Sequence, residues 1–271
     1  MNALNIHISP CPNDTFAFGA LILKKIPWNG PALNFSFMDI QNLNESGLSQ
    51  NKPDILKFSY AILPRLQKNY ILCNYGSALG KGVGPLLIGY GSKSLEQRKR
   101  IFVPGMDTTA TLLCKKYAPS HIPLEMLSYD KILKRLENDE DSAGVIIHES
   151  RFSYQNHNLN LLLDLGGKWE ETTKCPLPLG GIVLKKSLSD SIKKDFSIAL
   201  KNSIHWAWKN TETIRPLIKG HAQELSDTIT QQHIDLYVND DTSGLSTKGI
   251  QAIKELCDLK DLSLFNTSIE S

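Results

Sequence analysis

The chain has 271 residues, and its 30 lysine and arginine residues nearly balance its 28 aspartate and glutamate residues, which leaves a formal net charge of +2 at pH 7. A hydrophobic content of 41% and a charged content of 21% are typical of a folded globular protein, and the length predicts two modest domains. The charges are spread along the chain, which argues against binding to nucleic acid and against a basic membrane-binding segment. We therefore expect a small-molecule partner.

The N-terminal sequence and the cysteine pattern indicate the compartment. MNALNIHISPCPND lacks a cationic leader with a long apolar segment, and no apolar run approaches the ~20 residues of a membrane-spanning helix, so we expect a cytoplasmic protein. The five cysteines lie far apart without a C-x-x-C pair, and the seven histidines include no H-x-x-x-H pair. We therefore expect reduced thiols and no metal site.

Short apolar runs alternate with helical patterns in the first two thirds of the chain, which is typical of α/β units with a mainly parallel sheet. Before a glycine-rich stretch at 76–91, the pattern predicts strands at 4–8, 33–38 and 55–58 and helices at 15–24 and 60–67. Pro64 predicts a kink in the second of these helices.

After the glycine-rich stretch the alternation resumes, with strands predicted at 101–103 and 143–147 and helices at 109–117 and 129–138. From Ser189 onwards the pattern is helical only, and it predicts helices at 190–209, 223–237 and 247–257. We expect these last helices to pack back onto the first sheet.

Two segments rich in glycine and proline, at 76–91 and 175–181, have the composition of linkers. They predict a discontinuous first domain, made of residues 1–90 and 185–271, with a second domain of residues 91–184 inserted into it. A ligand is then expected in the cleft between the two domains.

The stretch SPCPNDT (residues 9–15) follows the first predicted strand. Pro10 and Pro12 bias the residues before them away from helix, and Asn13, Asp14 or Thr15 can cap the helix that follows. The turn therefore presents polar side chains and N–H groups at the carboxyl end of a strand, where ligands bind in open α/β sheets. Ordinary helix capping is the alternative explanation for the same residues.

The same construction occurs twice more. DILKFSYA ends a strand with Lys57, Phe58 and Ser59, and VPGMDTTATLL ends a strand with a Pro-Gly turn before Thr108 and Thr109. Hydroxyl groups beside the amides of a helix N-terminus suit a carboxylate. Three such turns favour an anionic ligand.

AGVIIHES (residues 143–150) carries the histidine most suited to catalysis. His148 and Glu149 fall where a buried strand is expected to emerge. A neutral imidazole, with an ordinary pKa near ~6.5, accepts a proton at cytoplasmic pH without a large shift. A structural role is the alternative for a single histidine.

Other mechanisms have less support in the sequence. There is no G-x-S-x-G nucleophile motif, no phosphate-binding loop and no G-x-G-x-x-G after the first strand. Cys11 is a candidate nucleophile near a helix N-terminus, but no partner base is identifiable for it.

Five motifs occur in order: SPCPNDTFAFGAL, GSALGKGVGPLL, PGMDTTATLL, GVIIHESRFSY and LPLGGIVL. With them the sequence resembles the 1,4-dihydroxy-6-naphthoate synthase family of the futalosine route to menaquinone. The resemblance implies a two-domain α/β fold like that of type II periplasmic binding proteins, with mixed sheets flanked by helices. It also implies a carbon–carbon lyase that converts cyclic dehypoxanthine futalosine, a carboxylate, to 1,4-dihydroxy-6-naphthoate without a cofactor.

The resemblance also implies roles for single residues. His148 matches the proton-abstracting base, and the implied substrate contacts are Lys57, Phe58, Ser59, Thr109 and Ala110. We expect Cys11, Asn13, Asp14 and Thr108 to lie near the substrate.

Two alternatives remain open at this point. The chorismate dehydratase family of the same pathway has the same general fold and also acts on an enol-ether carboxylate, but SPCPNDTF and GVIIHE point away from it. A non-catalytic solute-binding protein would share the cleft, yet it normally needs export or a lipid anchor.

Overall fold

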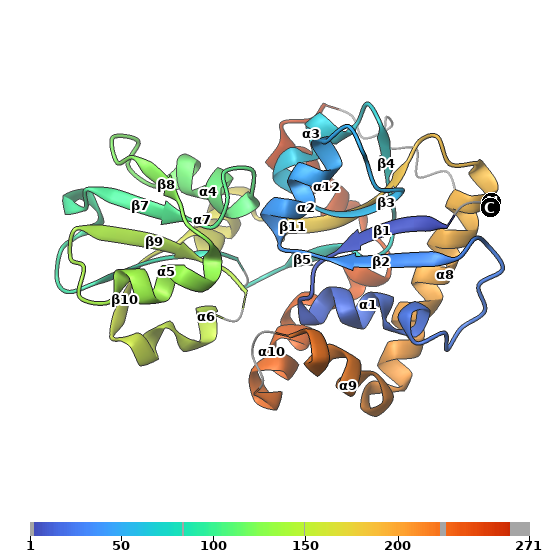
Figure 1. Ribbon diagram of the computed structural model, residues 1–271. Coiled ribbons are helices and arrows are strands. Elements are labelled where there is room, and N and C mark those ends of the chain that lie inside the picture. The colour runs from blue at the N-terminus through green and yellow to red at the C-terminus, as the bar shows by residue number, and fades with distance from the viewer. Residues whose placement is uncertain (1–2, 83, 149, 223–225, 261–271) are drawn as a thin grey trace. The chain divides into compact units, whose positions relative to one another are not determined.

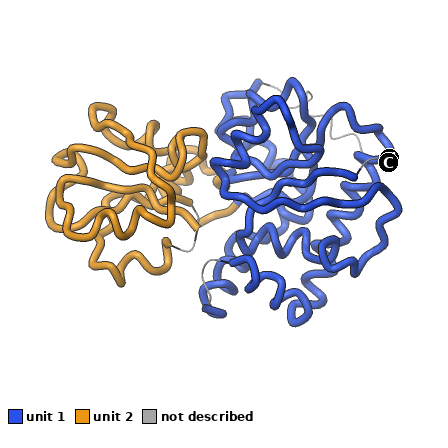
Figure 2. The backbone as a smooth tube through the Cα atoms, in the orientation of Figure 1, with its two compact units in different colours: residues 1–79, 178–271 blue, residues 80–177 orange. Residues whose placement is uncertain are grey.

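The computed structural model describes residues 3–82, 84–148, 150–222 and 226–260. The chain forms two compact units, coloured separately in Figure 2. The first unit combines residues 1–79 with residues 178–271, and the second consists of residues 80–177.

The first unit contains a mixed sheet whose strand order is β2-β1-β3-β11-β4, with β5 also paired to β11 (Figure 1). The strands are β1 (Leu4–Ile8), β2 (Leu33–Phe37), β3 (Ile55–Ser59), β4 (Tyr70–Leu72), β5 (Ala78–Gly80) and β11 (Leu177–Lys185). Strand β1 runs parallel to β2 and β3, whereas β11 runs antiparallel to β3 and β4. The carboxyl ends of β1 and β3 therefore lie at the same edge of the sheet, next to the start of α1.

Helices cover both faces of this sheet (Figure 1). Helix α1 packs against α8, α9 and α10, whereas α2 packs against β3 and α12 packs beside the 3-10 turn η1. The helices of this unit are α1 (Pro12–Ile22), α2 (Ile40–Leu48), η1 (Tyr60–Ile62), α3 (Leu63–Leu66), α8 (Asp190–Lys209), α9 (Thr211–His221), α10 (Asp227–Tyr237), α11 (Asp240–Ser243) and α12 (Thr247–Cys257).

The core of the first unit joins β1, α1 and α8. Alternate side chains of β1, including Ile6 and Ile8, pack with Phe18 of α1 and with Phe196 of α8, and all four are fully buried. The rings of Phe18 and Phe196 lie 6.3 Å apart between centroids. The expectation that the C-terminal helices pack back onto the first sheet is thus confirmed for α8.

The second unit contains a sheet with the strand order β10-β6-β9-β7-β8. Its strands are β6 (Leu86–Tyr90), β7 (Arg100–Val103), β8 (Leu124–Met126), β9 (Ser142–Ile146) and β10 (Leu159–Asp164). The helices are η2 (Leu95–Gln97), α4 (Thr109–Tyr117), α5 (Tyr129–Leu136), α6 (Ser150–Ser153), η3 (Tyr154–His157) and α7 (Leu165–Thr173).

Strand β9, which leads to His148, is buried along its whole length, with α5 packed closely on it. A Cβ atom at Gly144 would lie 2.6 Å from Cγ2 of Ile132 and 2.9 Å from Cδ1 of Leu136. Only glycine therefore lets α5 approach β9 this closely. Because α5 begins with Tyr129, its position on β9 also places the Tyr129 ring beside His148, which follows this strand.

Several predicted elements are confirmed at the predicted residues, namely the strand at 4–8 and the helices at 109–117, 190–209 and 247–257. The first helix begins at Pro12 rather than at Thr15. The predicted helix at 60–67 is a 3-10 turn followed by the short α3, which has Pro64 in its first turn. The predicted helix at 223–237 is described only from Asp227, since residues 223–225 lie outside the described residues.

The two segments expected to be linkers contain strands instead. Strand β6 (86–90) pairs with β9 and β10 in the second sheet, and β11 (177–185) pairs with β3 and β4 in the first. The chain passes between the units at 79/80 and at 177/178. The boundaries expected at 90/91 and 184/185 therefore differ from the observed division, because strand pairing across a sheet outweighs the turn-like composition of these segments.

No helix in the described part of the chain has both the length and the apolar character needed to cross a bilayer. No group of three or more His, Cys, Asp or Glu side chains among the same residues is placed to hold a metal ion.

Truncation of Phe196 tests the packing of α8 on the first sheet. Phe196→Ala removes a fully buried ring that contacts Phe18 and Trp28, so the free energy of unfolding should fall by about 3–5 kcal/mol. Urea unfolding followed by circular dichroism measures this change. Ile198→Ala is the matched control, because Ile198 lies on the same helix with 44% of its surface exposed and should change stability by less than ~1 kcal/mol. Equal effects of the two substitutions would contradict the assigned packing.

Candidate functional site

The turn SPCPNDT leads from β1 into α1. Cys11 is the N-cap residue in an extended conformation, without a side-chain capping hydrogen bond, and Pro12 is the first helical residue. Proline suits this position because its missing N–H is one that the first turn leaves without an intrahelical partner. The predicted capping by Asn13, Asp14 or Thr15 is therefore wrong, because these residues lie inside the first turn.

Asp14 is the centre of a buried polar cluster at the start of α1. Its side chain accepts hydrogen bonds from the backbone N–H (3.2 Å) and the hydroxyl (2.7 Å) of Ser9 through Oδ2. Its Oδ1 accepts from Asn13 Nδ2 at 2.8 Å and from Lys57 Nζ at 2.7 Å. Four donors thus compensate a carboxylate whose residue is only 1% exposed.

Lys57 pairs with Asp14 from β3, the strand that lies next to β1 in the sheet. Its side chain is 6% exposed against 2% for the side chain of Asp14. Gly180 on β11 makes room for it, because a Cβ atom there would lie 3.0 Å from Lys57 Cε and 2.7 Å from the backbone oxygen of Phe58. The first glycine of LPLGG therefore leaves space for the Lys57 side chain in the ion pair. The sequence motifs alone do not indicate this relation between Gly180 and Lys57.

Phe58 and Ser59 follow Lys57 on β3 and are also buried. The Phe58 ring is fully buried and packs edge-on against Tyr60, with centroids 5.2 Å apart. The backbone N–H of Ser59 donates to Asn44 Oδ1 of α2 at 2.9 Å. In this structure Phe58 has no exposed surface with which to meet a ligand, and the substrate contacts implied for both residues stay predictions.

Tyr60 follows Ser59 directly in the chain and is fully buried. Its hydroxyl lies 2.7 Å from the Ser77 hydroxyl, and burial raises the pKa of the Tyr60 phenol above its ordinary value. Gly181, the second glycine of LPLGG, leaves room for this ring, since a Cβ atom there would lie 2.6 Å from the Tyr60 oxygen. The phenol is therefore a neutral hydrogen-bonding group held by packing.

In the second unit, Thr108 is the N-cap of α4, as the sequence predicts. Its Oγ1 accepts from Thr111 N at 3.2 Å and donates to the Gly105 carbonyl at 2.9 Å. Thr109 and Ala110 begin the helix and are 3% and 4% exposed. The structure thus places these three residues together at a helix N-terminus that follows β7, which is the local arrangement we expected for binding a carboxylate.

His148 follows β9 after one intervening residue and is partly buried. Its backbone φ is +54°, a left-handed conformation that few residues other than glycine adopt without cost. Tyr129, the first residue of α5, packs edge-on against the imidazole with centroids 5.3 Å apart. An aromatic neighbour and a constrained backbone limit the orientations open to this ring. Its neighbour Glu149 lies outside the described residues.

One contact at the start of α1 was missed by the sequence reasoning. His233 of α10 is buried, and its Nε2 lies 3.1 Å from Asn13 Oδ1, although the two residues are 220 positions apart. In the sequence His233 is only one histidine within a helical pattern, so no local signal connects it with SPCPNDT.

The five cysteines are free thiols, as expected. Burial raises the pKa of Cys73, that of Cys114 to about 11 and that of Cys257 to about 12, so these three stay protonated at neutral pH. Cys11 is 8% exposed at the start of α1.

Comparisons with known proteins show the family to which this chain belongs. Residues 4–261 match the family described as "Menaquinone biosynthesis". A 1,4-dihydroxy-6-naphthoate synthase from Streptomyces coelicolor is 37% identical over 261 residues, which cover 94% of this chain and 92% of that protein. The chain belongs to the menaquinone biosynthesis family. A 1,4-dihydroxy-6-naphthoate synthase from Thermus thermophilus is 38% identical over 256 residues, covering 94% of this chain and 93% of that protein.

Solved structures of similar proteins confirm the predicted fold. A protein from Archaeoglobus fulgidus superposes with a TM-score of 0.88 at 27% identity, covering 95% of this chain and 96% of that one. A Candida albicans protein described as having the generic periplasmic binding protein fold matches with a TM-score of 0.69 at 13% identity, covering 98% and 95% of the two chains. The α/β fold of periplasmic-binding-protein type is therefore confirmed, whereas the ligand cleft stays a prediction.

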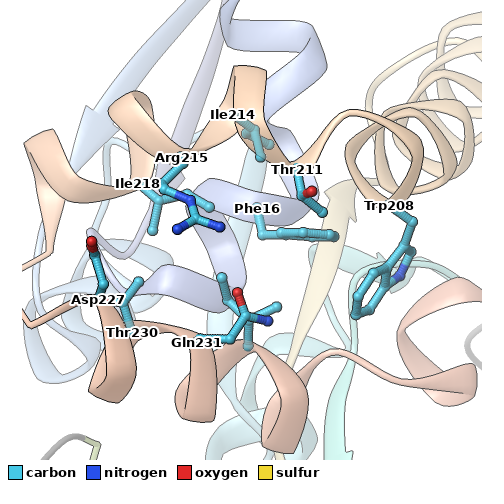
Figure 3. A pocket seen from close by; sticks show the side chains of 10 residues that line it. Phe16, Trp208, Thr211, Ile214, Arg215, Ile218, Asp227, Thr230 and Gln231 are labelled. Carbon is cyan, nitrogen blue, oxygen red and sulfur yellow. The ribbon is translucent and has the colours of Figure 1, made fainter.

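A small pocket in the first unit is formed by other residues (Figure 3). It lies between α1, α9 and α10 and is lined by residues that include Phe16, Trp208, Ile214 and Ile234. Its volume of about 30 Å³ suffices for one or two water molecules but not for a larger ligand. The residues predicted to contact the substrate do not line this pocket.

The Asp14–Lys57 ion pair gives a prediction about stability. Asp14→Leu leaves the buried Lys57 ammonium without its counter-ion, so the free energy of unfolding should fall by about 3–5 kcal/mol. The double variant Asp14→Leu/Lys57→Met removes both charges and should recover a large part of that loss. Urea unfolding measures both.

Glu171→Ala is the control for this prediction, because it breaks a solvent-exposed pair with Lys168 and should change stability by less than ~1 kcal/mol. A double variant no more stable than Asp14→Leu alone would show that the lost pairing of Lys57 is not the main cost.

Proposed function

We propose that this chain catalyses the conversion of cyclic dehypoxanthine futalosine to 1,4-dihydroxy-6-naphthoate, as a carbon–carbon lyase of the futalosine route to menaquinone. Family membership supports the reaction, because the two curated relatives of matching length are named 1,4-dihydroxy-6-naphthoate synthase. We place the reaction in the cytoplasm, with a small-molecule carboxylate as substrate and without a cofactor, as the sequence led us to expect.

In the proposed mechanism His148 removes a proton from the substrate. A retro-aldol-like step then breaks a carbon–carbon bond, its electron pair passes into the ring system, and the ribose-derived fragment leaves. Aromatisation of the product supplies a large driving force, so one positioned base can suffice.

The proposed binding groups come from the three turns that the sequence places at strand ends. The N-terminus of α4, with Thr109 and Ala110, offers amides and a hydroxyl that suit a carboxylate and stabilise developing negative charge. Lys57, held by Asp14, offers a positive charge near Ser59. Cys11, Asn13, Asp14 and Thr108 are proposed to support these groups rather than to react.

The observation that carries the assignment of the base is the position of His148. It follows a fully buried strand, its backbone is left-handed, and its ring packs against Tyr129. Residues in this sparsely populated backbone conformation cluster at functional sites, which supports a catalytic role for His148 beside its place at the strand end.

Substitution of His148 by asparagine tests the proposed base. Asparagine tolerates a left-handed backbone, so His148→Asn removes the imidazole without adding strain. Turnover of cyclic dehypoxanthine futalosine, followed by chromatography with mass detection of the product, should fall about 10²–10⁴-fold. Substrate affinity, measured by calorimetry, should change by less than about threefold because the base contributes to the transition state rather than to binding.

His157→Asn is the matched control for this experiment. It removes an imidazole from the same unit, at a residue on the 3-10 turn η3 that pairs with Glu137, and should leave turnover unchanged. Undiminished turnover in His148→Asn would refute the role of the base. Absence of product from the intact protein, with chorismate converted instead, would refute the proposed substrate.

A further inference from the structure

A line of hydrogen bonds connects α10 to the ion pair of the first unit. His233 Nε2 lies 3.1 Å from Asn13 Oδ1, and Asn13 Nδ2 donates to Asp14 Oδ1 at 2.8 Å. The same Asp14 oxygen accepts from Lys57 Nζ at 2.7 Å. His233, Asp14 and Lys57 are each at most 5% exposed, whereas Asn13, which links His233 to Asp14, is partly exposed.

The chemistry of the partners fixes the direction of each bond. A carboxylate only accepts, so Asn13 presents its NH₂ group to Asp14 and its carbonyl oxygen to His233. An amide oxygen also only accepts, and therefore Nε2 is the protonated ring nitrogen of His233. Donation thus runs from His233 to Asn13 and from Asn13 to Asp14, while Lys57 donates to Asp14 from the other side.

Apolar packing holds α10 against α1 independently of the hydrogen bonds among His233, Asn13 and Asp14. Ile234 of α10 and Val238, which directly follows this helix, cluster with Phe16 of α1 and Ile218 of α9, all of them buried. Figure 3 shows Phe16 among the residues contributed by α9 and α10. This apolar packing already holds α10 against α1 and α9. The hydrogen bond from His233 is therefore not needed to keep α10 in place.

The Asn13 amide controls where the Asp14 carboxylate points. Oδ1 of Asp14 is shared by Asn13 and Lys57, whereas Oδ2 is held by Ser9. An Asn13 side chain that turned away from Asp14 would remove one of the two donors on Oδ1 and free the carboxylate to shift. Since the Lys57 ammonium group donates a hydrogen bond to Oδ1 of Asp14, it would shift together with this oxygen.

We propose that His233 is a positioning residue, which through Asn13 fixes the Asp14 carboxylate and so sets the place of the Lys57 ammonium group. This inference rests on the proposed function, in which the Lys57 ammonium group is one of the groups that bind the substrate. His233 itself does not touch substrate. Its substitution should therefore weaken substrate binding and leave the proton transfer at His148 intact.

Steady-state kinetics with cyclic dehypoxanthine futalosine tests this proposal with three variants. His233→Leu removes the donor and should raise KM about tenfold while kcat stays within about twofold, which corresponds to the loss of one hydrogen bond in a charged network. His233→Gln, which keeps an N–H donor of similar reach, should restore KM to within about threefold of the original value. Ile234→Ala loosens the same helix but keeps His233, so it should lower the thermal midpoint without raising KM.

A second readout does not depend on turnover. Nitrogen-15 NMR of histidine-labelled protein should show His233 protonated at Nε2 in the intact protein, and Asn13→Ala should change that signal. His205→Leu, on the exposed side of α8, is the control for loss of an imidazole and should change neither KM nor the His233 signal.

The outcomes separate the two proposals. Unchanged KM in His233→Leu, failure of glutamine to restore it, or an equal rise in Ile234→Ala would overturn the positioning role. Protonation of His233 at Nδ1 alone would overturn it as well. Absence of turnover in the intact protein would instead refute the proposed function, and the NMR result would then still decide whether the His233–Asn13 bond exists.

Discussion

The buried ion pair between Asp14 and Lys57 is the interaction on which the arrangement of the first unit's candidate site depends. A lone charge of either sign would be too costly to hide inside the sheet, so each residue is acceptable only because the other is present. The pair joins the first turn of α1 to β3, and Gly180 of β11 leaves the space that the Lys57 side chain needs. Ser9 and Asn13 complete the bonding of the carboxylate, which explains why the turn before α1 is so rich in polar residues.

The three helices whose bounds were predicted correctly share a local signal. Helices α4, α8 and α12 each follow a Ser or Thr whose side chain accepts a hydrogen bond from the first turn, namely Thr108, Ser189 and Ser246. Helix α1 begins with Cys11 and Pro12 and has no such bond, and its start was misplaced by three residues. A capping side chain thus gives a local signal for a helix start, although the start of α5 at Tyr129 was also predicted correctly without such a bond at Ser128.

Other features depend on contacts between distant parts of the chain and had no local signal. Strand β11 contains LPLGG, whose proline and glycines favour a loop, yet it lies between β3 and β4 and pairs with both. The meeting of SPCPNDT and the end of β3 at one edge of the sheet was predictable because parallel strands bring their carboxyl ends to the same edge. That Lys57 would pair with Asp14, and that His233 would reach Asn13, depends on side-chain packing that no motif encodes.

The place of β11 in the first sheet also has a consequence for the order of folding during synthesis. All strands of the second sheet come from residues 86–164, so that unit can complete its hydrogen bonding as soon as this stretch has left the ribosome. The first sheet cannot, because β3 and β4, which end by residue 72, are joined only through a strand that begins at residue 177. The part of the chain made first is therefore finished last, and until then its unpaired strand edges are the ones a chaperone would need to protect.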